Sequence, residues 1–347
     1  MNLMKRILVL LLASMMLFAF VACDDNTPTP APHEHEFGEW TITKEATCTE
    51  EGVKTRTCKG CSETETEAIP AKGHNPDANG KCTACGKMIV SNGADFLKAT
   101  MNEGEVIISL QDDITIDIAP WPTNDKSVFG TASTTSIVVE GNGHTITFHN
   151  TDSDWNAIYT KNEDAVLTIK NATIDNSGYN ADGGTWNGHD ITFNCNVVLD
   201  NVTANNAIAV GMDATIRRST ISDNGGTTSA YMLWIQATCQ TVSIEDCTIN
   251  GKSSITNDNR AIKIADEYIG EPDRKSVTLN VSGTTFSSDS KAAVLVTNTA
   301  GATINWGSGN DISGVAADKV NAVWNDSARA DAIVKVSGCK VIQEPSA

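Results

Sequence analysis

The chain between residues 91 and 342 repeats a short phrase of alternating apolar and polar positions. The phrase reads apolar-x-apolar-x-turn residue-x-Thr-apolar. Because successive side chains of a strand point to opposite faces, this alternation predicts short strands with one face in a core. The copies are LTIKNATI (167–174), VVLDNVTA (197–204), ATIRRSTI (214–221), VSIEDCTI (242–249) and LNVSGTTF (279–286), and their threonines are Thr173, Thr203, Thr220, Thr248 and Thr285, with Thr145 in an earlier relative.

A second apolar phrase lies between the copies of the first. Two families of short strands that alternate along the chain indicate that each coil of a stack contributes at least two strands. Because Gly, Asn, Asp and Ser mark the corners, the pattern favours a parallel solenoid over a sandwich. The copies are NAIYT (156–160), NAIAV (206–210), RAIKI (260–264), AAVLV (292–296) and NAVWN (321–325), with DITFN (190–194) and MLWIQ (232–236) as looser members.

A short helix is expected ahead of the first coil. The stretch SNGADFLKATMNEG (91–104) has Asp95 near its start and Gly104 after its end. The strand-like sequences EVIISL and ITIDI follow it. A helix in this place would cover the open strand edge of the first coil and prevent edge-to-edge pairing.

With its two phrases and its cap, the region 91–342 resembles the right-handed parallel β-helix of pectin-lyase-like proteins. The resemblance implies an all-β solenoid of about 7–8 coils. It also makes an enzyme a legitimate expectation, because these proteins include polygalacturonases and pectate lyases. A non-catalytic binding or structural surface protein is the competing class.

The residues needed for hydrolysis are not gathered in the sequence. Glycoside hydrolysis uses two carboxyl groups around one bond, but Asp112 and Asp113 lie beside the cap, far from Arg260. Arg260 and Lys263 are three residues apart, so in a regular strand they face opposite sides, unlike an Arg-x-Lys pair. Hydrolysis therefore has little support here.

A lyase would need carboxylates on adjacent coils to hold calcium, together with an arginine base. The available aspartates do not share one column of the repeat, so calcium is kept only as the cofactor of this alternative. We expect a non-catalytic protein, with a polysaccharide lyase or glycoside hydrolase acting on uronic-acid polymers as the alternative. The aspartates considered are Asp175, Asp200, Asp223 and Asp246.

Aligning the second phrase defines a row of outward positions that contains aromatic side chains. Aromatic rings along a flat sheet can stack on sugar rings, and Lys263 could contact an acidic sugar, so the row is a candidate glycan-binding wall. The alternative is an ordinary structural role, in which Trp234 and Trp324 pack under loops. The candidate ligand-binding residues are Tyr159, Trp234, Lys263 and Trp324 on the row, and Trp186 and His189 in the loop 179–190.

A Cys-rich module is expected over residues 33–87. Its cysteines include the arrangement C-x2-C-x20-C-x2-C, which can present four thiolates tetrahedrally to a structural zinc ion and is similar to zinc ribbons. The alternative is two disulfides, which an oxidising exterior favours. The expected ligands are Cys58, Cys61, Cys82 and Cys85, with Cys48 and His74 as alternates.

The module also resembles small Cys/His modules found ahead of repeat domains in surface proteins of anaerobic bacteria, which implies a structural role. Four later cysteines are expected to be small, buried and reduced. Cys247 and Cys339 share a column about three coils apart, which is too far for a disulfide at ~4.8 Å per coil. The other two are Cys195 and Cys239.

The first 32 residues indicate export. Lys5 and Arg6 precede an uncharged apolar run, residues 7–22, which is short for a membrane span and typical of a signal peptide. The run ends FVAC, which resembles a bacterial lipobox with Cys23 as the lipid-modified residue; an ordinary cleaved signal is the alternative. Residues 23–32 form a Pro/Thr tether.

Charge narrows the possible partners. With 43 acidic and 25 basic residues the net charge is −18, so nucleic acid is excluded as an expected partner, since binding it depends on clustered Lys and Arg. The sequence therefore predicts an exported protein, lipid-anchored to a bacterial membrane and facing the cell exterior or periplasm. Its expected role is recognition, adhesion or scaffolding, with a polysaccharide or another surface polymer as the partner.

Overall fold

The computed structural model divides the chain into two compact units, Met1–Lys72 and Gly73–Ala347. The boundary falls inside the span 33–87 that the sequence predicts as one module. The predicted signal peptide and tether lie outside the described residues. No helix of the described part has the length and apolarity of a membrane span. The described residues are 34–118, 128–150, 157–175, 191–222, 231–251, 260–265, 276–288, 292–297, 301–315, 321–325 and 333–343.

The first unit is built on a small antiparallel sheet in the order β1-β2-β3. Its strands are β1 (Thr41–Lys44), β2 (Gly52–Thr57) and β3 (Thr64–Ile69). Most of their side chains are exposed or half-buried, and the buried apolar side chains of its described residues are those of Ala46 and Cys58. A sheet with so little core needs another source of stability.

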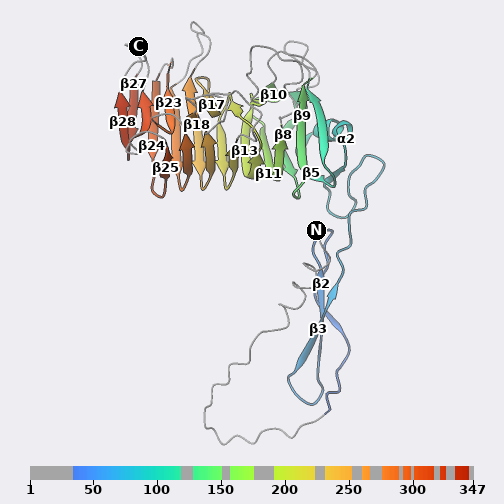
Figure 1. Ribbon diagram of the computed structural model, residues 1–347. Coiled ribbons are helices and arrows are strands. Elements are labelled where there is room, and N and C mark those ends of the chain that lie inside the picture. Colours follow the sequence, from blue (N-terminus) through green and yellow to red (C-terminus); the bar gives the residue numbers. More distant parts are fainter. Residues whose placement is uncertain are drawn as a thin grey trace, which may run out of the picture. The chain divides into compact units, whose positions relative to one another are not determined.

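The second unit is almost entirely parallel β-structure (Figure 1). A 9-stranded sheet has the order β28-β26-β23-β20-β17-β14-β12-β10-β7, and a 16-stranded sheet contains the other strands. The 9-stranded sheet consists of β7 (Val128–Phe129), β10 (Ala157–Thr160), β12 (Ile191–Phe193), β14 (Ile208–Val210), β17 (Tyr231–Gln236), β20 (Arg260–Ala265), β23 (Val294–Val296), β26 (Asn321–Asn325) and β28 (Lys340–Gln343).

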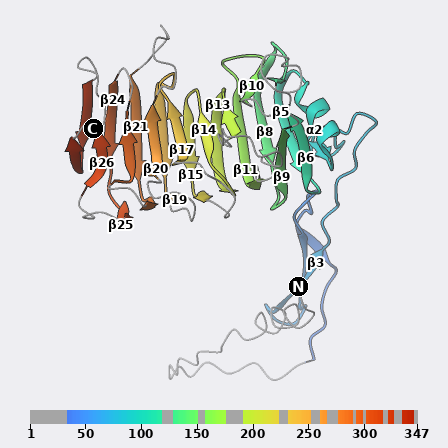
Figure 2. The same ribbon diagram turned by 45° about the horizontal axis from the view of Figure 1, so that its top comes forward.

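The 16-stranded sheet runs along the whole stack, and Figure 2 shows its strands side by side. Its strands are β4 (Met88–Val90), β5 (Gly104–Leu110), β6 (Ile114–Ile118), β8 (Thr134–Glu140), β9 (Thr145–Asn150), β11 (Val166–Asp175), β13 (Asn196–Ala204), β15 (Ala214–Arg217), β16 (Thr220–Ser222), β18 (Thr241–Glu245), β19 (Thr248–Gly251), β21 (Val277–Ser282), β22 (Thr285–Ser288), β24 (Gly301–Trp306), β25 (Asp311–Val315) and β27 (Ile333–Ser337).

This architecture is a parallel β-helix, as the sequence predicts. Strand side chains alternate between a continuous apolar core and the outside, as in β11, where Leu167, Ile169 and Ile174 are buried. The threonines of the first phrase are in register on successive coils. This threonine ladder consists of Thr145, Thr173, Thr203, Thr220, Thr248 and Thr285.

The turn residue of the first phrase forms the corner between two faces of the stack. Asn171, Asn201 and Asp246 adopt positive φ values of 51°, 55° and 53°, and Gly283 has φ 60°. Asn, Asp and Gly tolerate this left-handed conformation. Arg218 takes the same corner with φ 50°, where a long side chain has no such tolerance.

Replacing Arg218 with Asn is expected to stabilise the protein by about 0.5–1 kcal/mol, because Asn relieves part of the left-handed strain. Arg218 pairs with Asp200, but Asp200 keeps its ion pair with Arg217 in this variant, so the loss of the exposed Arg218 side chain costs little. The matched control is Arg217→Asn, at the end of extended β15, which loses its ion pair with Asp200 and relieves no strain. Urea unfolding should move the midpoint up for the first variant and down for the second; a fall for both contradicts the strain argument.

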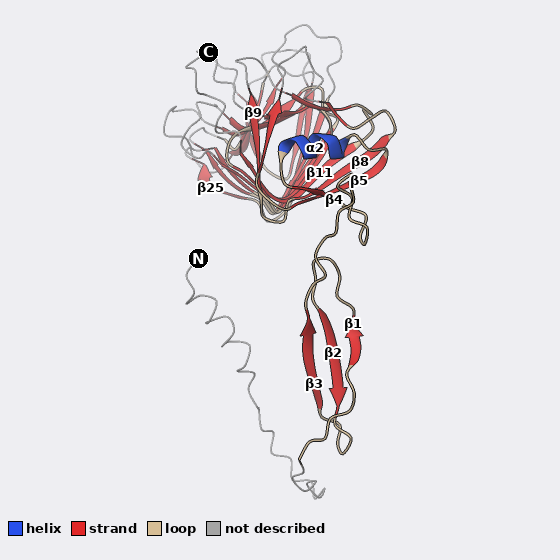
Figure 3. Cartoon of the chain, turned by 90° about the vertical axis from the view of Figure 1, so that its right-hand side faces the viewer, coloured by secondary structure: helices blue, strands red, loops and turns tan. Residues whose placement is uncertain are grey.

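The expected cap is the helix α2 (Gly93–Thr100). Asn92 is its N-cap, and its Oδ1 accepts a hydrogen bond of 2.9 Å from the backbone N–H of Asp95. Phe96 is buried and meets Phe129 edge to face at 5.6 Å between ring centroids. Figure 3 shows α2 lying across the end of the stack, where it covers apolar side chains of the first coil.

Candidate functional site

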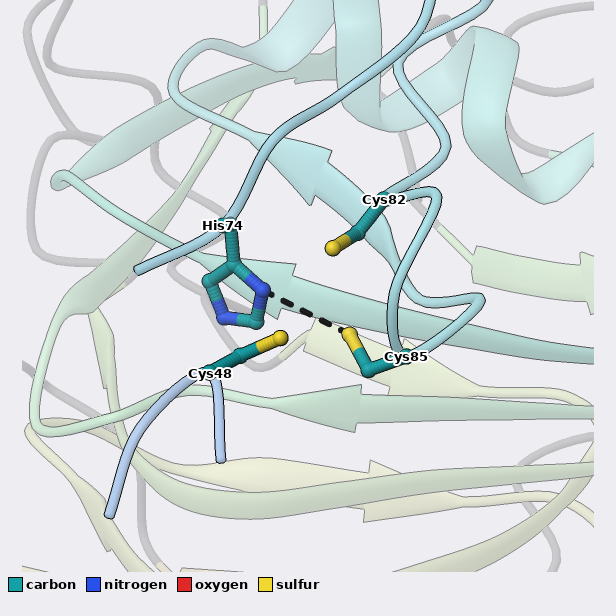
Figure 4. A group of neighbouring side chains, drawn as sticks. All are labelled: Cys48, His74, Cys82 and Cys85. Atoms are coloured by element: carbon teal, nitrogen blue, oxygen red, sulfur yellow. Dashed lines mark hydrogen bonds between the residues drawn. The ribbon is translucent and has the colours of Figure 1, made fainter. Parts of the chain in front are cut away.

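Three side chains of the second unit gather in the first of two Cys/His clusters (Figure 4). The ligand atoms of His74, Cys82 and Cys85 all lie within 4.8 Å of one another. Nδ1 of His74 is 3.5 Å from Sγ of Cys85. Nε2 of the same ring is buried and has no hydrogen-bond partner among the described residues. The ring therefore uses its Nδ1 side toward the sulfur atoms.

The loop that carries Cys82 and Cys85 is a tight knuckle. The N–H of Gly86 donates to the carbonyl of Cys82 at 2.8 Å, and the N–H of Cys82 donates to the carbonyl of Lys87 at 2.8 Å. Gly86 has φ 76°, a conformation that suits glycine. Hydrogen bonding from the backbone of Cys85, then from His74, lowers the pKa of Cys82 to about 5. A thiolate is the form of cysteine that binds metals.

The second cluster consists of His35, Cys58 and Cys61, again with ligand atoms within 4.8 Å of one another. Nδ1 of His35 is 3.4 Å from Sγ of Cys61. Nε2 of the same ring is 2.9 Å from a carboxylate oxygen of Glu63. The pKa of His35 is raised, first by its hydrogen bond with Cys58 and further by the charge of Glu63.

The sequence predicts one site made of both C-x2-C pairs. Within the first unit, Cys58 and Cys61 lie with His35. Within the second unit, Cys82 and Cys85 lie with His74, which the sequence gives as an alternate ligand. His35 was missed, although a histidine ahead of a C-x2-C pair is visible in the sequence.

The structure contains no disulfide bond among the described cysteines. Cys195, Cys239 and Cys247 are buried and Cys339 is half-buried. Burial raises the pKa of Cys195 to about 12 and that of Cys339 to about 11. Cys195, Cys239 and Cys247 are therefore buried as the sequence predicts, and Cys339 is partly so.

The outward row of the 9-stranded sheet is also present, with one change of register. Thr192 pairs with Ala157 where the sequence places Tyr159, and Tyr159 pairs with Val128 of β7. The remaining members are in register: Thr192, Ala209, Trp234, Lys263, Leu295 and Trp324.

The two tryptophans of this row are packed instead of exposed, which agrees with the alternative given for them and not with an exposed aromatic surface. Trp234 is 1% exposed and Trp324 is 8% exposed. The indole N–H of Trp234 donates to the carbonyl of Ala265 at 3.0 Å. Tyr159 is half-buried, and burial raises its pKa. Trp186 and His189 lie outside the described residues. Trp234 and Trp324 are packed side chains, not a stacking surface.

Lys263 is half-buried against two rings. Its Nζ lies 5.0 Å from the centroid of Tyr231 and 4.9 Å from that of Trp234, within the range of a cation–π contact. Arg260 is the first residue of β20 and pairs with Tyr231.

Trp234→Ala is expected to destabilise the protein by about 3–5 kcal/mol, because it leaves a large cavity and removes one partner of Lys263. Trp234→Phe should cost less, since the ring remains while the indole hydrogen bond is lost. The check is the denaturant midpoint of each variant. A change below about 1 kcal/mol for Trp234→Ala would mean that the ring is not a packed element.

The outer surface of the 16-stranded sheet carries two ladders. In the threonine ladder, Thr203, Thr248 and Thr285 are exposed and the others half-buried. The side chains of the second ladder alternate in charge. This ladder was not predicted from the sequence, although each of its last four members directly precedes a corner residue. The charge ladder consists of Glu140, Lys170, Asp200, Arg217 and Glu245 in register.

The charge ladder accounts for one of the carboxylates considered for calcium. Asp200 is 6% exposed. It accepts a hydrogen bond of 3.0 Å from Nε of Arg217 and pairs with Arg218. Asp175 is in register with Thr147, and Asp246 is a corner residue. Asp223 lies outside the described residues. The aspartates described here do not share a column.

Residues 87–216 match the family model described as "Putative pectate lyase-like adhesive domain". The match covers α2 and the strands from β4 to β15, which include both ladders in part. No curated protein and no solved structure matches the chain. At this level the second unit is similar to adhesive, pectate lyase-like β-helices.

Proposed function

We propose that the protein is a non-catalytic surface protein that recognises or adheres to a polymer through the outside of its β-helix. The similarity of residues 87–216 to an adhesive domain is the observation that carries this proposal. Export and lipid anchoring at Cys23 belong to it, since they would place the β-helix at a cell surface. A lipoprotein anchor holds a protein to a membrane without a spanning helix.

The threonine ladder is the best supported contact surface. It offers hydroxyl groups, each a donor and an acceptor, at the spacing of successive coils, ~4.8 Å. A regular row of this kind suits a polymer that lies along the stack. Because the chain carries a net charge of −18, a neutral polysaccharide is favoured over a uronic-acid polymer.

The test is binding of the full chain to a panel of immobilised neutral and uronic-acid polysaccharides. The double variant Thr203→Glu plus Thr248→Glu should lose at least about tenfold in affinity for a neutral polymer. The matched control is Thr135→Glu plus Thr241→Glu, on exposed threonines outside the ladder. Equal binding by both double variants would remove the ladder from the proposal.

The same panel separates recognition from catalysis. New reducing ends, or absorbance from unsaturated products formed with calcium present, would replace the proposal with a hydrolase or lyase. Binding without either product supports recognition. Absence of binding to every polymer would leave the β-helix as a spacer and contradict the adhesive proposal.

We also propose that the Cys/His clusters hold zinc in a structural role. Thiolate and imidazole groups are the ligands that zinc takes in closed protein sites. The first unit has little buried apolar surface of its own among its described residues. Zinc bound by the purified protein and retained through dialysis would support this role, and a metal-free protein with the same fold would contradict it.

A further inference from the structure

The two Cys/His clusters differ from the single site that their cysteine spacing predicts. A C-x2-C-x20-C-x2-C spacing usually means one metal ion shared by four thiolates. Here each C-x2-C pair has its own histidine. His35 stands with Cys58 and Cys61, and His74 stands with Cys82 and Cys85. One shared site would leave both histidines without a ligand role.

We propose that the chain binds two zinc ions, one at His35, Cys58 and Cys61 of the first unit and the other at His74, Cys82 and Cys85 of the second unit. This inference rests on the proposed structural role of zinc and deepens it. Each set supplies three ligands from within one unit, counted among the described residues.

The nitrogen–sulfur distances fit this assignment. For a tetrahedral zinc with Zn–S near 2.3 Å and Zn–N near 2.0–2.1 Å, two ligand atoms should lie ~3.6 Å apart. The observed separations are 3.4 Å between His35 Nδ1 and Cys61 Sγ, and 3.5 Å between His74 Nδ1 and Cys85 Sγ. Each histidine thus presents one nitrogen to its cysteines at the spacing of two ligands of one ion.

The position of Glu63 independently supports a metal ion at His35, Cys58 and Cys61. Its carboxylate lies 2.9 Å from Nε2 of His35, the nitrogen that faces away from Cys61. Metal-binding histidines commonly donate their second N–H to a carboxylate, which fixes the tautomer and orients the ring. Glu63 is therefore a positioning residue, and Nδ1 of His35 is the atom left for the metal.

Metal content of the full chain and of paired variants tests the inference. The wild-type protein should hold two zinc ions per chain. Cys58→Ser plus Cys61→Ser should hold one, Cys82→Ser plus Cys85→Ser should hold one, and the combination should hold none. The control Cys339→Ser, at a half-buried cysteine of the β-helix, should keep both.

The outcomes separate this inference from the proposal that it extends. One zinc ion in the wild type, lost in either paired variant, would establish a single shared site and overturn the two-centre inference alone. No zinc in the wild type would overturn both. If a paired variant fails to fold, cobalt titration of the wild type decides, because two centres predict saturation at two equivalents.

Glu63→Gln provides a test that leaves every ligand in place. It should weaken zinc binding at the centre that contains His35 by about 10–100-fold and leave zinc binding at the centre that contains His74 unchanged. Competition with a chelator measures both affinities. Glu63→Asp should restore part of the affinity. The matched control is Glu65→Gln, whose carboxylate pairs with Arg56, and it should change neither centre. Equal weakening of both centres, or of neither, would contradict the role of Glu63.

Discussion

Removal of zinc is expected to unfold the sheet β1–β3 while the β-helix keeps its structure. The apparent binding free energy of structural zinc is about 10–16 kcal/mol in zinc-finger peptides, and it appears as folding free energy. The sheet has little core of its own, with Ala46 and Cys58 as the buried apolar side chains of its described residues. Surface ion pairs such as Arg56 with Glu65 contribute little in comparison.

Limited proteolysis with a strong zinc chelator measures this effect. Cleavage should appear within residues 34–87, and the fragment from β5 onward should resist. A calcium-selective chelator is the control and should change nothing in this part of the chain. Resistance of residues 34–72 after complete zinc removal would show that the sheet folds without metal.

Phe193→Ala is expected to destabilise the β-helix by about 3–5 kcal/mol, because it opens a cavity in a close-packed core. Phe193 is fully buried in β12, and its ring meets that of Phe148 edge to face at 6.5 Å between centroids. Phe193→Leu keeps most of the volume and should cost less. Zinc content should be the same in both variants.

Urea unfolding followed by far-ultraviolet circular dichroism measures the two variants. The matched control is Thr203→Ala in the neighbouring strand β13, which removes an exposed side chain and should shift stability by less than about 1 kcal/mol. A cost for Phe193→Ala no larger than that of the control would place Phe193 outside the core.

The sequence predicted the β-helix because its fold depends on a period of two and on a repeated corner. The threonine alignment made from the phrases is the register seen in the structure, from Thr145 to Thr285. The helix α2 was predictable because Asn92, Asp95 and Gly104 are local signals. Such features depend on residues close together in the chain.

The side-chain environments were less predictable because they depend on distant segments. The outward direction of Trp234 followed from the strand pattern, but its burial did not, since a residue on the outer face can still be covered. Tyr159 was placed opposite Thr192, whose partner is Ala157, two residues earlier, because the similarity of NAIYT and DITFN does not fix the register of the two strands. The pairing of each cysteine with a histidine depends on how the chain folds back on itself.

The sequence contains a signal for the charge ladder that was not used in predicting the structure. Lys170, Asp200, Arg217 and Glu245 each precede a corner residue, and their signs alternate. Because coils stack in register, neighbouring copies of one position become neighbours in space. Comparing one position across all the copies would have predicted the pairs Lys170–Glu140 and Arg217–Asp200.

The central claim is that the two C-x2-C pairs serve separate zinc ions, and zinc X-ray absorption spectroscopy of the full chain tests it most directly. The two centres together contain four cysteine sulfurs and two histidine nitrogens, so we expect about two sulfur atoms and one imidazole nitrogen per zinc ion from these residues. Four sulfur atoms and no imidazole around each zinc ion would contradict it.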